Sequence, residues 1–378
     1  MERKIIRALL AFALLLCLSS AIKDIQCTKY TCKTSSQNFD PLTCAYLDNS
    51  SNTYYAQACA KSTDDCFQVQ GFNYSCGPTY TSGISFPGEE CKSANDCHSL
   101  YTAGCKDGIC VGSAEGQDCN SSRSCEPNFY CQLTLNICKP LIKIGETGCL
   151  NDYECVNNAA CNVTDINNPS LNTCYPWHSF GVHDPVGGCE SGISALCPYN
   201  YCQENSDTNF YCTDLLSSPV TPASQCDINS SDNCQSTSDP FFTPPFSIKG
   251  TCSCGLNSQG NANCQIFPGD LPYQAYLKQL NKWNSSEHIT KCNTMRRFHK
   301  NCVKTYWSKK ESDAFSFYQV QNSMYSQIQG SESCVLDAFA LNYVRAKDEY
   351  NGGDDDNDDN NSGAKEICIS MLILIAIS

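Results

Sequence analysis

Apolar residues are sparse over most of this chain. Between residues 22 and 366 long aliphatic runs are nearly absent, and cysteine supplies part of the apolar content. Two short apolar runs stand apart, at residues 8–18 and 367–378. Because there is so little aliphatic surface to bury, most of the chain is expected to be held by cross-links more than by a hydrophobic core.

From Leu271 onward the pattern changes to the spacing of amphipathic helices. The apolar residues that recur at this spacing are Tyr276, Leu277, Leu280, Trp283, Cys292, Phe298, Cys302, Tyr306, Cys334, Leu336, Phe339, Leu341 and Val344. Residues 284–287, Asn-Ser-Ser-Glu, offer a capping box. We therefore expect residues 268–350 to form a small helical domain, cross-linked by its three cysteines and one upstream partner and packed onto the last cysteine-rich module.

Residues 87–214 contain four cysteine cassettes laid end to end. Each begins with a glycine and continues as C-x5-C-x5–7-C-x4–12-C, more loosely in the fourth. The cassette cysteines are Cys91, Cys97, Cys105 and Cys110; Cys119, Cys125, Cys131 and Cys138; Cys149, Cys155, Cys161 and Cys174; and Cys189, Cys197, Cys202 and Cys212. Each cassette is too short to fold on a core alone. Tandem repetition therefore predicts an elongated rod of modules that contact mainly their neighbours.

Two local signals predict tight turns in the cassettes. A glycine opens each cassette, and we expect it to adopt a positive φ. These glycines are Gly88, Gly116, Gly145 and Gly188. Asp107-Gly108, between Cys105 and Cys110, is a hairpin signal whose strands are too short to stand without a bridge.

Two further cysteine-rich regions flank the cassettes. Residues 22–86 carry six more widely spaced cysteines with interleaved tyrosines, which predicts a small N-terminal domain of short strands and turns. Residues 215–267 form a separate knot whose end, Cys252-Ser-Cys254 to Cys264, is similar to the C-x-C-x8-C close of an EGF module. EGF modules need six cysteines and this region has five, so an EGF-like hairpin and a different knot both stay open.

Composition places the protein in an oxidising compartment. Thirty-two cysteines in 378 residues indicate a disulfide scaffold. An even number remains without Cys17 and Cys368, which lie in terminal segments expected to be removed. The net charge of −14 argues against binding to nucleic acid, since no basic stripe is present. We expect small disulfide-rich modules in tandem (short β-hairpins and loops), followed by a small α-helical, disulfide-linked C-terminal domain.

The two ends predict the cellular address. Residues 1–21 combine a basic start, an apolar stretch and small residues before a cleavage point, as in a secretory signal peptide; the alternative is a retained anchor helix. Residues 363–378 resemble a GPI-attachment signal, with Ser362 the preferred attachment residue. The alternative is a tail that packs or stays disordered. The acidic residues 351–362 indicate a solvated stalk and lack the EF-hand calcium pattern.

Secretion also gives meaning to the N-x-S/T sequons. Several are expected to carry N-glycans, and therefore to lie on exposed loops. The sequon asparagines are Asn49, Asn73, Asn120, Asn162, Asn229, Asn284 and Asn360.

In its cysteine spacing the cassette region resembles a known extracellular family. The Gly-x-x-Cys…Gly-x-Cys grammar, as in Gly88-Glu-Glu-Cys91 to Asp107-Gly-Ile-Cys110, is similar to the Dickkopf N-terminal type of cysteine-rich repeat. Tandem copies between a signal peptide and a GPI-type tail resemble GPI-anchored cysteine-rich surface proteins of ciliate-type unicellular eukaryotes. The third cassette departs from the pattern with twelve residues between Cys161 and Cys174, and nothing resembles the receptor-binding half of Dickkopf ligands.

Signals for catalysis or metal binding are weak. There is no C-x2-C, so a zinc ribbon is not expected, and Cys252 and Cys254 fit half of a knot better than a redox pair. His178 and His183 could form a metal or acid/base pair, although loop histidines usually do not. No common hydrolase or phosphate-binding motif is present. No cofactor, metal or catalytic residue is expected.

Together these features predict a glycosylated, GPI-anchored protein on the outer face of the plasma membrane. It would act in a coat, adhesion or recognition by binding a protein or glycan ligand, without catalysis. The alternative is a soluble secreted signalling ligand or inhibitor of the Dickkopf type. A third hypothesis places a secreted hydrolase in the helical domain, with His288 and His299 as candidate residues.

Overall fold

A computed structural model describes residues 29–32, 43–48, 51, 53–58, 64–70, 73–78, 84–189, 194–204, 209–215, 225–229, 234–237 and 247–352. The predicted signal peptide, the anchor signal with Ser362, nearly all of the acidic stalk, and the sequons at Asn49 and Asn360 lie outside these residues. Within the described residues, none of the helices combines the length and the apolar character that crossing a bilayer requires.

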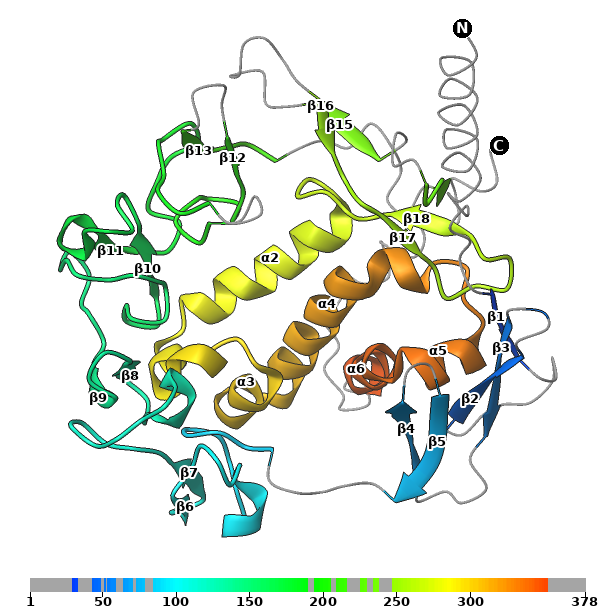
Figure 1. Ribbon diagram of the computed structural model, residues 1–378, viewed down its shortest axis with the longest axis horizontal. Coiled ribbons are helices and arrows are strands. Elements are labelled where there is room, and N and C mark those ends of the chain that lie inside the picture. Colours follow the sequence, from blue (N-terminus) through cyan, green and yellow to red (C-terminus); the bar gives the residue numbers. More distant parts are fainter. Residues whose placement is uncertain are drawn as a thin grey trace, which may run out of the picture.

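The helical region predicted from periodicity is present and forms a hub. Its helices are α2 (Leu271–Asn284), α3 (Lys300–Tyr306), α4 (Lys309–Ile328), α5 (Ser333–Phe339) and α6 (Leu341–Gly352), with 3-10 turns at η5 (Glu287–Lys291) and η6 (Thr294–Arg296). Helix α2 packs on α4, and α4 on α6 (Figure 1). The buried core of the hub contains Leu277, Leu280, Trp283, Ile289, Cys292, Cys302, Val303 and Phe315.

One local detail of the hub differs from the expectation. The capping box predicted at residues 284–287 does not begin a helix at Asn284, which instead ends α2. Ser286 is the N-cap, and its hydroxyl accepts a hydrogen bond from the backbone N–H of His288. The motif therefore starts a 3-10 turn two residues later, because α2 continues through Asn284 to bury Trp283.

Each cassette ends in a two-stranded hairpin (Figure 1). The pairs are β6 (Gly104–Lys106) with β7 (Ile109–Val111), β8 (Phe129–Gln132) with β9 (Ile137–Pro140), β10 (Ala159–Asn162) with β11 (Thr173–Pro176), and β12 (Cys202–Glu204) with β13 (Phe210–Cys212). Short 3-10 turns, η1 (Ala94–Asp96) and η2 (Ser122–Ser124), precede the second cysteine of the first two cassettes, and η3 (Pro169–Leu171) lies between the strands of the third.

Disulfides tie each hairpin to the loop before it. The third and fourth cysteines of a cassette are cross-strand neighbours, as in Cys131 and Cys138, yet they do not bond to each other. The third cysteine pairs with the first and the fourth with the second in every cassette: Cys91–Cys105, Cys97–Cys110, Cys119–Cys131, Cys125–Cys138, Cys149–Cys161, Cys155–Cys174, Cys189–Cys202 and Cys197–Cys212. The sulfur atoms thus make the centre of each module, as the scarcity of aliphatic residues requires.

The predicted turn chemistry is confirmed. Gly88, Gly116, Gly145 and Gly188 all have positive φ. Asp107 and Gly108 both have positive φ, as a tight hairpin turn needs.

The region after the cassettes repeats their disulfide pairing. Cys226 bonds to Cys252 and Cys234 to Cys264, so the first and third and the second and last of these four are joined. Its strands are β14 (Gln225–Cys226), β15 (Gln235–Thr237), β16 (Ser247–Lys249), β17 (Cys252–Cys254) and β18 (Ala262–Cys264). The EGF-like end is therefore wrong: Cys264 reaches back to Cys234 instead of closing on Cys254, which is bonded elsewhere. We call this region the fifth module.

The N-terminal strands pack on the C-terminal part of the hub. Strands β1 (Lys29–Cys32), β2 (Thr43–Asp48) and β3 (Thr53–Ala58) form one sheet, with β3 in the centre and parallel to β1. Strands β4 (Asp64–Gln70) and β5 (Asn73–Pro78) form a separate hairpin. The ring of Phe339 in α5 meets Tyr30 and Tyr54 edge-on, so the beginning and the end of the described chain share one contact.

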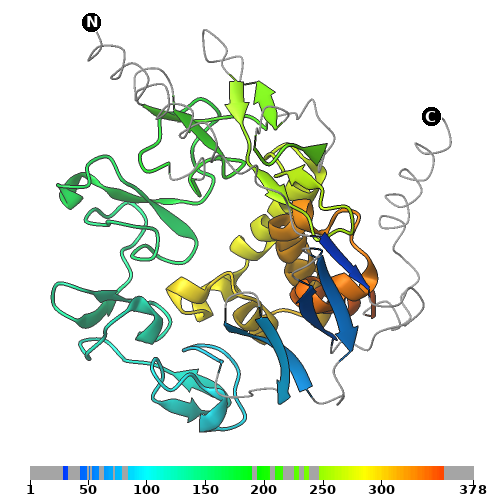
Figure 2. The same ribbon diagram turned by 45° about the vertical axis from the view of Figure 1, so that its right-hand side comes forward.

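The cassettes do not extend away as a rod. Figures 1 and 2 both show them in an arc around the hub, running from cassette one below, along the left, to cassette four above. The fifth module closes on α4, where Leu256 N–H donates to Gln327 O and Asn263 Nδ2 to Ser326 O. The hub therefore packs on the last knot, as expected, and also on every cassette, which the sequence did not predict.

Candidate functional site

The inner surface of the arc is held by one stretch of the hub, residues 287–307, which we call the central segment. It runs through η5, η6 and α3 and is closed by the disulfide Cys292–Cys302. Its polar side chains contact cassettes one, two and three in turn. Two of the three hub cysteines are therefore cross-linked as predicted; the side chain of the third, Cys334, is outside the described part of the structure.

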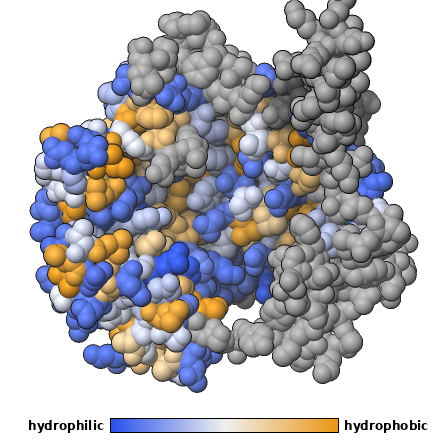
Figure 3. Space-filling view, in the orientation of Figure 1, coloured by the Kyte–Doolittle hydropathy of each residue, from blue (hydrophilic) through white to orange (hydrophobic). Residues whose placement is uncertain are grey.

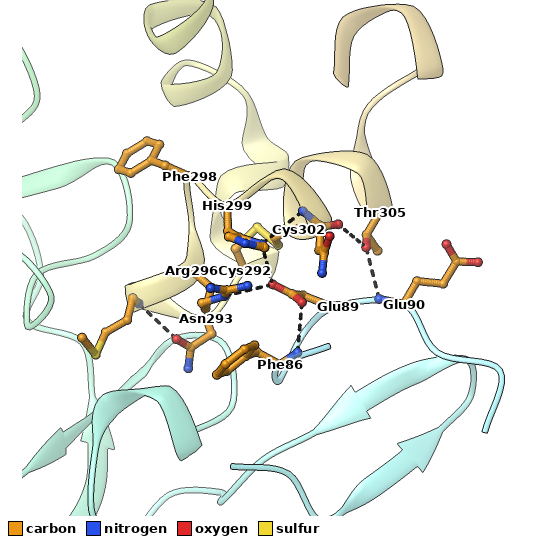
Figure 4. Close-up of polar contacts among 12 residues, drawn as sticks. Phe86, Glu89, Glu90, Cys292, Asn293, Arg296, Phe298, His299, Cys302 and Thr305 are labelled. Atoms are coloured by element: carbon orange, nitrogen blue, oxygen red, sulfur yellow. Dashed lines mark hydrogen bonds and ion pairs between the residues drawn. A yellow bond between two sulfur atoms is a disulfide. The ribbon is translucent and has the colours of Figure 1, made fainter. Parts of the chain in front are cut away.

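Cassette one is attached through a buried carboxylate (Figure 4). Glu89 accepts a hydrogen bond from Phe86 N–H at 3.0 Å, and its other oxygen lies 3.3 Å from Arg296 Nε. The side chain of Glu89 is 1% exposed and the guanidinium of Arg296 lies over the Phe86 ring. Burial raises the pKa of Glu89, while the Phe86 N–H and the charge of Arg296 oppose that shift.

Two further contacts join side chains of α3 to the backbone of cassette one, and Figure 4 shows the one between Thr305 and Glu90. Tyr306 donates its hydroxyl to Gly88 O at 2.7 Å, and Glu90 N–H donates to Thr305 Oγ1 at 3.1 Å. A Cβ at Gly88 would lie 2.7 Å from Lys291 O, so this glycine serves the junction as well as the turn.

The position of Glu89 explains the polar step that opens the cassettes. Gln117 and Glu146 hold the same place after the opening glycine, and each accepts the backbone N–H three residues earlier, as Glu89 does. These other two side chains are exposed. The step is therefore a turn device in all three cassettes, and in the first it also binds the hub.

The imidazole ring of His299 belongs to the cluster around Glu89 and is neutral. Its Nδ1 accepts the N–H of Asn301 as the N-cap of α3 and lies 3.7 Å from Glu89 Oε1. Burial, together with the charges of Arg296 and Lys300, lowers the pKa of His299 to about 4. At neutral pH the contact with Glu89 is therefore not an ion pair.

This arrangement predicts an acid-dependent loss of stability. The pKa of His299 is about 6.5 in the unfolded chain and about 4 in the folded protein, so its contribution is present above pH 6.5 and is lost as pH falls toward 4. In the variant His299→Asn, asparagine keeps an N-cap acceptor. Between pH 7 and pH 4.5 we expect the Tm of this variant to fall by at least about 2 °C less than the Tm of the wild type. Equal pH dependence of Tm in thermal melts of the two proteins would contradict the assignment.

Cassettes two and three are attached through two buried asparagines, one that belongs to the hub and one that belongs to cassette three. From the hub, Asn293 donates Nδ2 to Ser122 O and Cys125 O, both at 2.7 Å. From cassette three, Asn157 donates Nδ2 to Ile289 O at 2.7 Å and Cys292 O at 2.8 Å. The two asparagines are 0% and 1% exposed, respectively.

Arg297 is the most deeply buried cation of the central segment. Its Nη1 donates to Asp152 O and to Thr294 Oγ1, and Thr294 in turn donates to Tyr153 O in cassette three. The guanidinium lies within 5.7 Å of three ring centroids, those of Tyr153, Trp177 and Phe298. Burial lowers its pKa to about 10, so it stays charged at neutral pH.

Cassette four is attached by aromatic residues. Tyr273 in α2 donates its hydroxyl to Tyr199 O at 2.8 Å. Just before this cassette, Trp177 packs on Phe298, with ring centroids 4.7 Å apart. Burial lowers the pKa of His178, whose Nε2 contacts the Oδ1 of Asn200 at 2.8 Å, while His183 N–H donates to Cys212 O. In these contacts both histidines serve the internal structure of the cassette.

Candidate metal ligands among the described residues are already bonded to one another. The cysteine groups whose sulfur atoms lie close enough to hold an ion are Cys91, Cys97 and Cys105; Cys119, Cys125 and Cys138; Cys149, Cys155 and Cys161; and Cys226, Cys234 and Cys252. Every one of these cysteines is in a disulfide. Cysteine binds metal as a thiolate, and a sulfur atom in a disulfide is not a thiolate. In the oxidised modules these cysteines therefore serve as cross-links.

Several large apolar side chains of the cassettes remain exposed to solvent. Large apolar side chains that are exposed and take no part in the junctions described above are found on cassettes two and three: Leu133, Leu135, Ile144, Leu150, Ile166, Leu171 and Tyr175. Figure 3 shows apolar patches over the region of the cassettes, at the left of the view, set among hydrophilic residues. Leu133 and Leu135, 65% and 57% exposed, are in the loop that joins β8 to β9. We call this set the outer apolar face.

The structure places four sequon asparagines in describable positions. Asn120 and Asn229 are exposed, whereas Asn162 and Asn284 are partly buried. Asn162 Oδ1 accepts Gly187 N–H, and Asn284 Oδ1 is buried. Asn73 lies in β5, and its side chain is outside the described part of the structure.

No family model, curated protein or solved structure matches this chain. The residues that build the inner attachment, Glu89, Asn157, Asn293 and Arg297, were not singled out from the sequence. Asparagine and arginine side chains that bind backbone carbonyls leave no spacing pattern, since every residue carries a carbonyl.

Proposed function

We propose that this protein is a GPI-anchored, cysteine-rich cell-surface protein that acts by binding through the outer apolar face. The observation that carries the proposal is the contrast between the junctions with the hub and the exposed surface of the cassettes. Polar side chains at the junctions are engaged in attaching modules to the hub, while large apolar side chains elsewhere on the cassettes contact solvent. Apolar side chains that gather into exposed patches on a rigid surface are typical of recognition sites.

The compartment rests on the disulfides. Eleven bridges join cysteines within the described residues, which is typical of extracellular or secreted proteins. Each bridge restricts the unfolded chain and holds a loop that has almost no core of its own. A loop fixed in this way loses little conformational entropy when it binds a protein or glycan partner.

The proposal is for a non-catalytic protein. Glu89, His299 and Arg296 are the closest approach to an acid/base cluster at the central segment. The carboxylate of Glu89 is buried, and its two oxygens contact the Phe86 N–H and the Arg296 guanidinium. Both oxygens therefore serve to attach cassette one to the hub. His288, the other histidine of the hydrolase hypothesis, stacks near Tyr306 at 6.4 Å between ring centroids.

One experiment tests the anchor and the face in sequence. Cells expressing the full chain are treated with phosphatidylinositol-specific phospholipase C, and we expect release into the supernatant. Released protein is then labelled and added to fresh cells. We expect Leu133→Ser/Leu135→Ser to reduce cell binding by roughly tenfold or more, as loss of a hot spot does.

Leu271→Ser supplies the matched control, since Leu271 is 68% exposed on the hub and lies outside the outer apolar face. Equal binding by the wild type and the Leu133/Leu135 variant would reject the face. Appearance in the medium without enzyme would reject the anchor and favour a soluble ligand of the Dickkopf type.

A further inference from the structure

Two surface hollows of this protein share an unexpected feature. One, of about 430 Å³, lies between cassettes one and two, and the other, of about 290 Å³, lies on the fifth module. Each is lined by an asparagine of an Asn-Ser-Ser sequon, Asn120 in the first and Asn229 in the second. Both asparagines occupy the loop between the first and second cysteines of their module, and both are exposed.

The larger hollow has walls from two modules. Leu100, Tyr101 and nearby residues of cassette one form one wall, and Gln117, Asp118 and Asn120 of cassette two contribute to the other. Leu100 is 73% exposed. The volume of this hollow falls in the lower part of the range of roughly 300–1,000 Å³ that is usual for small-ligand pockets.

The chemistry of these walls suits a sugar joined to Asn120. A pyranose ring has an apolar C–H face and a rim of hydroxyl and amide groups. The side chains of Leu100 and Tyr101 can cover the former, and those of Gln117 and Asp118 can bond the latter. A glycan begins at the asparagine nitrogen, so the covalent bond already holds its first sugar residues beside the hollow. Their binding there therefore costs little additional entropy.

We propose that the hollow between cassettes one and two is the seat of the chain's own N-glycan on Asn120. The glycan is attached to cassette two and packs against cassette one, covering Leu100 and Tyr101 and fastening the junction from outside. In the fifth module the sequon Asn229 likewise lines a hollow. The inference rests on the proposed passage through the secretory pathway, because glycosylation takes place there.

Chymotrypsin tests the seat, because it cleaves after Leu and Tyr. The full chain and its Asn120→Gln variant are produced in a eukaryotic secretory host, and cleavage sites are followed by mass spectrometry after reduction. We expect the variant to be cut after Leu100 or Tyr101 roughly fivefold faster or more. Cleavage after Leu133 and Leu135, which lie in the same cassette as Asn120 but outside the hollow, serves as the internal reference and should not change.

Asn95→Gln is the matched control: Asn95 is exposed in cassette one and is not part of a sequon. An unmodified Asn120, equal cleavage at Leu100 in both proteins, or a rise at Leu133 and Leu135 as large as that at Leu100 would each overturn the proposal. Absence of glycan from every sequon would instead reject the secretory compartment. Glycans elsewhere with a bare Asn120 would reject the seat alone.

Discussion

Arg297→Ala is expected to lower the free energy of unfolding by about 2–5 kcal/mol, because it deletes a large buried side chain together with its hydrogen bonds. Arg297 is 3% exposed and joins Asp152 O to the central segment. Its removal leaves a cavity among three aromatic rings and an unpaired carbonyl in cassette three. Denaturant unfolding with intact disulfides measures the loss.

The effect should be local as well as global. We expect faster hydrogen exchange in β10 and β11 of cassette three, while cassette one keeps its wild-type rates. Lys304→Ala is the control, since it removes an exposed positive charge from the same segment. If Arg297→Ala and Lys304→Ala are equally stable, the buried guanidinium does not attach cassette three.

Asn293→Asp is expected to destabilise the protein by about 2–4 kcal/mol and to loosen cassette two, because the change removes a paired donor from buried carbonyls. The side-chain NH₂ of Asn293 now binds two carbonyls, Ser122 O and Cys125 O. A carboxylate of the same shape would place negative oxygen against both of them. It would still accept the N–H of Met295 as the present Oδ1 does, so the turn η6 itself is spared.

Asn95→Asp provides the matched comparison, an identical chemical change at an exposed position. Thermal melts together with hydrogen exchange over β8 and β9 measure the outcome. We expect Asn95→Asp to behave as the wild type. Unchanged exchange in cassette two of the Asn293→Asp protein would show that the disulfides alone hold this cassette against the hub.

These attachments give the arc its stiffness. A disulfide module on a free linker would tumble independently, whereas each cassette here contacts the central segment or its neighbours in the hub through buried side chains. The spacing between exposed groups on the outer apolar face is thereby set by the hub. A partner that touches two cassettes at once would gain from this fixed spacing.

Several features could be predicted from the sequence because their causes are local. Helical periodicity located α2 and the helices after it, since the apolar side of each must repeat every three to four residues. The glycines that open the cassettes and the Asp107-Gly108 turn were predicted correctly, because positive φ selects glycine and asparagine-like residues. Cysteine spacing located the modules, although it left the pairing open and suggested an EGF-like end that the bond Cys234–Cys264 excludes.

The sequence by itself thus determined the oxidised modules, their turns and the helices, each through chemistry that acts within about one module. Only the tertiary structure decided that the modules curve around the hub. The contacts responsible join residues far apart: Asn157 to Ile289 across 132 positions, Asn293 to Ser122 across 171, and Arg296 to Glu89 across 207. Such hydrogen bonds use backbone carbonyls or single charged groups, which look the same at an exposed loop and at a buried junction. Burial alone distinguishes them, and burial is a property of the folded chain.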